Sequence, residues 1–144
     1  MTTPALGVDV GTVRVGFAGS DETGTIATPL RTVPRQPQAR LLREVEGIIS
    51  ERLPECLVVG LPRRLDGSEG DSAADARGLA EQLRRRTGLP VEMWDERFTT
   101  AAAERGLIAA GERRAQRRRH IDAVAASLLL QSWLDSRATL RAAR

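Results

Sequence analysis

The spacing of apolar residues changes period once along the chain, and this change constrains the fold more than any other feature. Up to about residue 33, apolar residues alternate with polar or small ones, as on the two faces of a strand. From residue 41 onward, runs at helical spacing alternate with short, continuous apolar runs. An antiparallel three-strand meander followed by parallel strands and helices predicts an α/β fold, with a mixed five-stranded sheet and helices on both faces.

The first part of the chain predicts three consecutive strands. Residues 5–10 place Leu, Val and Val on one side and Gly and Asp on the other, and residues 13–17 alternate in the same way. Gly11 and Thr12 between these runs are typical of a hairpin turn. The segment 25–33 contains a proline and predicts an edge strand, because proline donates no ladder hydrogen bond.

The remainder of the chain predicts helices alternating with strands. Helical spacing from residue 41 predicts a helix that ends before Pro54, and Ser72 and Asp75 resemble the capping box of a second helix that closes at Gly88. The other expected elements are strands over 56–62 and 90–96, a helix over 99–110, a basic loop over 111–120, a final helix over 121–135 and a flexible basic tail over 136–144.

Composition indicates one ordinary globular domain over residues 1–144, with 41% apolar and 28% charged residues. The sequence contains no apolar run of about 18 residues and no basic segment before an apolar one near its start, so we expect a cytoplasmic protein without membrane contact. Cys56 is the only cysteine, which excludes an internal disulfide framework and favours a packing role.

Positive charge is concentrated in the last third of the chain, where residues 97–144 hold ten Arg and four acidic residues. Such asymmetry favours a polyanionic partner such as nucleic acid. The segment 111–120 is either a solvated loop or a phosphate-binding arm, and Arg63 and Arg64 precede a helix start that could bind phosphate. The arm would act through Arg113, Arg114, Arg117, Arg118 and Arg119. No Walker motif is present, which excludes a P-loop nucleotide hydrolase.

Three carboxylates stand at places where such sheets carry their sites. Asp9 ends the first strand, Asp95 and Glu96 close the last one, and Asp122 lies on the core-facing stripe of the final helix. Taken singly, Asp9 could be a turn acid, Glu96 a partner of Arg97, and Asp122 a first-turn acid favoured by the helix dipole. Taken together, Asp9, Glu96 and Asp122 predict a site for one or two Mg²⁺ or Mn²⁺ ions that supports phosphodiester hydrolysis.

Four motifs in order resemble the YqgF (RuvX) family: DVGTVRVG at 9–16, VVGLPRRLDGSEG at 58–70, DERFTT at 95–100 and HIDAVAASLLLQSWLD at 120–135. The resemblance implies a ribonuclease H-like fold and a metal-dependent nuclease. Members are described as nucleases that mature the 5′ end of pre-16S ribosomal RNA and as Holliday-junction-resolvase-like proteins. It implies that the catalytic acids are Asp9, Glu96 and Asp122, with Thr12, Arg14, Arg97 and Thr100 as neighbours of substrate or metal.

The sequence therefore leaves four alternative functions to consider. The first is a nuclease acting on structured RNA in ribosome biogenesis, and the second a resolvase of branched DNA in recombination and repair. A resolvase that cuts two strands needs two active sites and hence a homodimer. The third is a non-catalytic RNA-binding module, which would gain only repulsion from the three acids. The fourth, an actin-like or sugar-kinase-like nucleotide binder, needs a second domain for which 144 residues leave no room.

Overall fold

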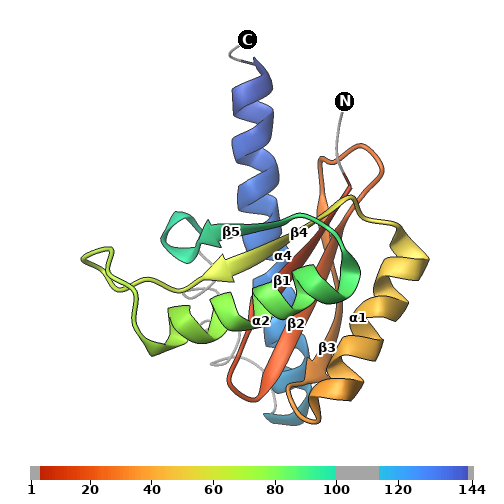
Figure 1. Cartoon of the computed structure of the whole chain (residues 1–144). Coiled ribbons are helices and arrows are strands. Elements are labelled where there is room, and N and C mark those ends of the chain that lie inside the picture. The colour runs from red at the N-terminus through yellow and green to blue at the C-terminus, as the bar shows by residue number, and fades with distance from the viewer. Residues whose placement is uncertain (1–3, 100–113, 143–144) are drawn as a thin grey trace.

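The structure, a computed structural model, describes residues 4–99 and 114–142, with only the backbone described at 114–120 and 141. Five strands form one sheet in the order β3-β2-β1-β4-β5 (Figure 1). Strands β1, β2 and β3 pair antiparallel, whereas β4 pairs parallel with both β1 and β5. The predicted mixed sheet and its edge strand β3 are therefore confirmed. The strands are β1 (Ala5–Val10), β2 (Arg14–Ser20), β3 (Ala27–Pro34), β4 (Cys56–Leu61) and β5 (Val91–Asp95).

Helices cover both faces of the sheet, as the sequence predicts. Helices α1 (Gln38–Arg52) and α2 (Asp71–Thr87) lie on one face, and α4 (Arg114–Ala142) crosses the other (Figure 1). A short 3₁₀ turn, η1 (Glu96–Phe98), follows β5 directly. Within residues 4–99 and 114–142, no helix combines the length and apolar character needed to cross a membrane.

The two faces of the sheet carry different cores. The face under α1 and α2 is packed with large side chains, among them Leu6, Val8, Phe17, Leu41, Ile48 and Leu57. The face under α4 has a smaller apolar cluster of Ala5, Ala18, Val58, Ala126, Leu130, Trp133 and Leu134. Strand β1 lies between the two cores, and its Gly7 is so close to α4 that a Cβ there would be 2.9 Å from the Leu130 Cβ.

Helix α2 begins differently from the prediction. Its first residue is Asp71 and its N-cap is Gly70, which makes no side-chain capping hydrogen bond, so the predicted Ser72–Asp75 capping box is wrong. The Asp75 carboxylate instead accepts two hydrogen bonds from the Arg35 guanidinium, at 2.9 Å and 2.7 Å. A bidentate pair with a guanidinium is stronger than a single bond from a backbone N–H, and it therefore takes the carboxylate.

Helix α4 is longer at both ends than the sequence predicts. Residues 114–120, expected as a loop, are helical, which agrees with the high helix propensity of Arg, Ala and Gln. Residues 136–142, expected as a flexible tail, continue the helix, and the Arg137 guanidinium lies 4.6 Å from the centre of the Trp133 ring. Beyond its first residue, the helix predicted over 99–110 lies outside the described residues.

Candidate active site

Asp9 lies within β1 and not in a turn. It is only 3% exposed, and the antiparallel register places it opposite Gly16 of β2. The hairpin turn comes later, where the Gly11 N–H donates to the Arg14 carbonyl at 2.9 Å. A Cβ on Gly11 would come within 2.5 Å of that same carbonyl oxygen, so glycine permits the tight turn. The interpretation of Asp9 as a turn acid is therefore wrong, and a buried carboxylate needs another explanation.

Asp122 approaches Asp9 from the helix above the sheet. A Cβ on Gly16, the strand partner of Asp9, would overlap the Asp122 carbonyl, so the bare glycine lets α4 contact β2 there. The Asp122 carboxylate accepts a hydrogen bond of 2.9 Å from the Arg14 Nε and is largely buried. Because α4 begins at Arg114, about two turns earlier, the interpretation of Asp122 as a first-turn acid is wrong.

The core-facing stripe predicted for Asp122 is confirmed. The side chains at the matching helical positions are all buried, namely Ala125, Ala126, Leu129 and Trp133. Three of these residues are within one or two turns of Asp122 and hold this part of α4 against the sheet. The small alanines explain how a carboxylate on the same stripe comes close to the strands.

Glu96 reaches the same region from the other side of β1. A Cβ on Gly60 of β4 would lie 2.7 Å from the Glu96 Oε1 and 3.2 Å from the Leu129 Cδ2 of α4. The parallel register pairs Val8 with Val59, so Gly60 follows in line beside Asp9. The Glu96 carboxylate therefore lies over the strand next to Asp9, on the face that α4 covers.

The three predicted acids thus gather around one position of the sheet. Asp9 is central, and the glycines on either side of it, Gly16 and Gly60, are covered by Asp122 and Glu96. Carboxylate oxygens are the ligands that a hard divalent cation prefers, so the donor chemistry fits Mg²⁺ or Mn²⁺. Among the residues described, no three acidic, His or Cys side chains stand close enough to hold a metal ion. A cation held by all three carboxylates would therefore require these side chains to come closer together.

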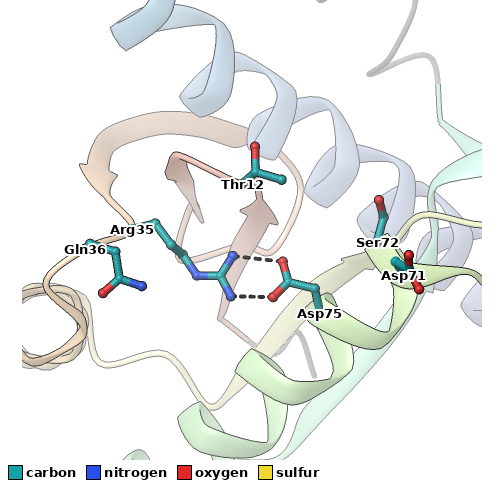
Figure 2. A pocket seen from close by; sticks show the side chains of 6 residues that line it. All are labelled: Thr12, Arg35, Gln36, Asp71, Ser72 and Asp75. Atoms are coloured by element: carbon teal, nitrogen blue, oxygen red, sulfur yellow. Dashed lines mark hydrogen bonds and ion pairs between the residues drawn. The ribbon is translucent and has the colours of Figure 1, made fainter.

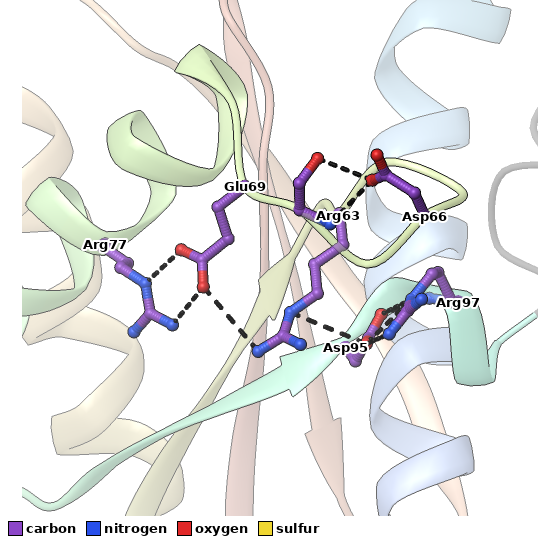
Figure 3. A network of polar contacts seen from close by, with 7 residues as sticks. Arg63, Asp66, Glu69, Arg77, Asp95 and Arg97 are labelled. Atoms are coloured by element: carbon purple, nitrogen blue, oxygen red, sulfur yellow. Dashed lines mark hydrogen bonds and ion pairs between the residues drawn. The ribbon is translucent and has the colours of Figure 1, made fainter.

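Two of the arginines predicted to bind nucleic acid meet at one carboxylate (Figure 3). Asp95, the last residue of β5, accepts hydrogen bonds from the Arg97 backbone N–H at 2.9 Å and from the Arg97 Nη2 at 2.8 Å. The Arg63 Nε lies 3.7 Å from the same carboxylate. The hydrogen bonds from Arg97 hold the pKa of Asp95 below its ordinary value. Sequence alone predicts Asp95 as a strand-ending acid, and Arg97 either as a partner of Glu96 or as a neighbour of substrate or metal. It does not reveal the pairing of Arg97 with Asp95.

The loop between β4 and α2 carries the other predicted arginine, Arg64. Its backbone N–H donates to the Ser68 carbonyl at 2.9 Å, and a Cβ on Gly70 would lie 2.6 Å from its Nη2. The loop is thus folded back on itself next to η1. Thr100 and Arg113 lie outside the described residues, as do the side chains of Arg114, Arg117, Arg118 and Arg119.

A polar pocket of about 400 Å³ lies beside the hairpin turn (Figure 2), lined by Thr12, Arg35, Gln36, Asp71, Ser72 and Asp75. Besides its pair with Asp75, the Arg35 guanidinium donates to the Gly11 carbonyl at 3.0 Å. Arg35 therefore ties the turn that follows Asp9 to α2. These partners lie 24 and 40 residues from Arg35 in the chain, so no local sequence pattern predicts them.

The fold is similar to that of solved Holliday junction resolvases. The structure resembles that of Thermus thermophilus RuvC in complex with a Holliday junction substrate, with a TM-score of 0.57 and 17% identity, covering 94% of this chain and 96% of that one. It also resembles the fowlpox virus resolvase bound to junction DNA, with a TM-score of 0.53 and 12% identity over 92% and 97% of the two chains. At these identities the likeness shows the fold, which is the ribonuclease H-like fold of resolvases.

Sequence comparison then places the chain more narrowly. The RuvX family, described as Holliday junction resolvase, matches residues 3–136, and the chain belongs to this family. Relatives named "Putative pre-16S rRNA nuclease" include one from Mycobacterium ulcerans, 46% identical over 96% of this chain and 82% of that protein. Another, from Mycolicibacterium paratuberculosis, is 49% identical over 92% and 80% of the two chains. The family resemblance drawn from the four motifs is confirmed.

Proposed function

We propose that this protein is a metal-dependent nuclease that hydrolyses phosphodiester bonds during 5′-end maturation of pre-16S ribosomal RNA in the cytoplasm. The observation that carries the proposal is the gathering of Asp9, Glu96 and Asp122 around two glycines of the sheet. Carboxylates that gather in one place repel one another, and a bound divalent cation relieves this repulsion. The names of the curated relatives support ribosomal RNA as the substrate.

Each acid has a distinct support. Asp9 is held rigidly in the middle of the hydrogen-bonded sheet, Glu96 projects from η1, and Asp122 is oriented by Arg14. These three residues would hold one or two Mg²⁺ or Mn²⁺ ions. Such ions, when bound, lower the pKa of a coordinated water and stabilise the leaving oxygen. The Leu129 side chain of α4 lies beside Gly60, on the same side as the Glu96 carboxylate.

The arginines around the acids would bind the nucleic-acid backbone. Arg14, Arg63 and Arg97 lie on three different segments that all border the acids, and Thr12 stands exposed in the hairpin turn. Guanidinium groups suit phosphate oxygens because they present paired donors. Binding should therefore weaken steeply as salt concentration rises.

The test is one cleavage experiment with two substrates. Labelled pre-16S leader RNA and a four-way DNA junction are incubated with Mg²⁺ or Mn²⁺ and wild type, Asp9→Asn or Asp21→Asn. Asp21 is an exposed-turn acid between β2 and β3 and serves as the matched control. We expect Asp9→Asn to lower the cleavage rate by about 10³-fold and Asp21→Asn to leave it unchanged. Cleavage that persists in Asp9→Asn would exclude this active site.

The family description favours one alternative, resolution of four-way DNA junctions. Preferential cleavage of the junction, together with a dimeric mass in light scattering, would establish it, since a resolvase needs two active sites. Metal-independent binding without cleavage of either substrate would instead indicate a non-catalytic RNA-binding module.

A further inference from the structure

We propose that Asp95 is a positioning residue that holds Arg63 and Arg97 together as a phosphate-binding pair and sets the direction of Glu96. Neither the motifs nor the comparisons assign this carboxylate a role. The proposal rests on the proposed function and extends it to the substrate phosphates next to the catalytic acids.

The first observation is how completely Arg97 occupies Asp95. Its backbone N–H, Nε and Nη2 all donate to the carboxylate, at 2.9 Å, 3.0 Å and 2.8 Å. The backbone bond makes Asp95 the N-cap of η1, so the same carboxylate fixes the turn in which Glu96 is the first residue. Because Asp95 is only 8% exposed, this arrangement is shielded from competing water.

The second observation is that the Arg63 guanidinium lies near the Asp95 carboxylate but forms no hydrogen bond with it. Its Nε is buried and has no hydrogen-bond partner within the described part of the chain, and it lies 3.7 Å from the Asp95 Oδ2. Its Nη2 lies 3.7 Å from Glu69, whose carboxylate is already bound by Arg77 at 2.6 Å (Figure 3). Arg63 therefore retains donor capacity that its acidic neighbours do not use.

The third observation links the two arginines to the loop between them. Gly67, in the loop between β4 and α2, has a φ of 88°, and a Cβ there would lie 3.2 Å from the Arg97 Nη1. The loop thus packs directly on the guanidinium. Two guanidinium groups therefore lie against one carboxylate, next to the residue that carries Glu96. A phosphate one or two nucleotides from the cleaved bond is the group that such a pair fits.

The test compares two substitutions that change the net charge equally. Asp95→Asn and Asp66→Asn each remove one negative charge from the same cluster, but Asp66 is exposed and hydrogen-bonds only its loop neighbour Ser68 among the contacts described. Affinity for the leader RNA and the four-way junction is measured in Ca²⁺, and kcat and KM are measured in Mg²⁺ or Mn²⁺. Electrostatics alone would tighten binding equally in both variants.

We expect Asp66→Asn to bind as tightly as wild type or up to about threefold tighter, and Asp95→Asn to bind at least about fivefold more weakly despite its added positive charge. We also expect kcat of Asp95→Asn to fall at least about tenfold, because Glu96 is displaced. Equal affinity and equal kcat in the two variants would overturn the proposal.

Two further measurements separate positioning from folding and from the proposed function. Arg97→Lys keeps the charge and the backbone bond but loses the planar fork, and it should reproduce at least half of the loss in affinity; wild-type affinity in Arg97→Lys would contradict a phosphate-binding pair. If Asp95→Asn fails to fold, Arg97→Lys alone decides. If wild type binds both substrates but cleaves neither, the nuclease proposal fails while the affinity comparison still tests the role of Asp95.

Discussion

One face of the sheet carries an apolar core and the other carries the candidate active site. Neighbouring residues of the β1–β2 hairpin show this difference. Val8 pairs with Phe17, and both are fully buried under α1 and α2. One residue later in β1 and one residue earlier in β2, Asp9 pairs with Gly16 under α4. Because successive side chains of a strand point to opposite faces, a step of one residue separates a closed apolar core from a polar site.

Stability and reactivity are placed on opposite faces of the sheet. The face under α1 and α2 is filled by large apolar side chains, and it should provide most of the free energy of folding. The face under α4 uses glycine and alanine to bring a helix and two acids close to Asp9. Larger side chains should therefore disturb the face under α4, whereas smaller side chains should destabilise the face under α1 and α2.

The largest effect on stability should come from truncating the apolar face. Phe17→Ala removes a fully buried ring and should lower the free energy of unfolding by about 3–5 kcal/mol. Urea denaturation at neutral pH measures the change. The rate of cleavage per folded molecule, measured well below the melting temperature, should stay within about twofold of wild type. A large loss of rate in folded protein would mean that the two faces are not independent.

Its neighbour should show the reverse balance. Gly16→Ala places a methyl group where the Asp122 carbonyl lies, so α4 must shift away from Asp9. We expect unfolding to be easier by about 1–3 kcal/mol and the cleavage rate of the folded protein to fall at least about tenfold. Ala18 offers a matched control on the same strand face, since Ala18→Gly removes a methyl group without crowding the helix. A Gly16→Ala protein with the full cleavage rate would contradict the close approach of Asp122.

The sequence predicts the parts of this arrangement that depend on local patterns, but not those that depend on contacts between residues far apart in the chain. Alternation along β1 and helical spacing along α4 are local patterns, and they correctly predict the faces on which Asp9 and Asp122 lie. The acidic partner of each arginine is instead determined by the tertiary structure. Arg14 pairs with Asp122 across 108 residues, and Arg97 pairs with Asp95 instead of serving Glu96. Many acids compete for each guanidinium in a sequence with 22 arginines, so only the fold selects among them.

Local signals predict where α1 and α2 end, at Leu53 and Gly88, but not where α2 begins or how far α4 extends. The capping box predicted at Ser72 does not form, because the Asp75 carboxylate pairs with Arg35 instead. The charged segments at 114–120 and 136–142 look solvated in sequence, yet they extend a helix whose middle is anchored in the sheet. A helix already formed adds residues more easily than a new one starts.

A smaller effect should come from the contact that joins the hairpin turn to α2. Hydrogen bonds from Arg35 hold the pKa of Asp75 below its ordinary value of 3.8. The pair therefore contributes fully above pH 3.8, and the contribution is lost as pH falls through the lower pKa of the folded protein. Because the Asp75 side chain is 43% exposed, we expect at most about 1 kcal/mol.

Urea denaturation of wild type and Asp75→Asn over a series of pH values measures this contribution. The difference in free energy of unfolding should be constant at neutral pH and should shrink below pH 3.8, the ordinary value. A difference that stays constant down to the lowest accessible pH would show that the Asp75 charge does not stabilise the turn.

Calorimetric titration with Mn²⁺ measures directly whether the acids under α4 form one cation site. Wild type, Asp9→Asn and the control Asp21→Asn are compared in the absence of nucleic acid. We predict that wild type and Asp21→Asn bind Mn²⁺ equally and that Asp9→Asn binds at least about tenfold more weakly. Equal affinity in all three proteins would contradict one cation site formed by these acids.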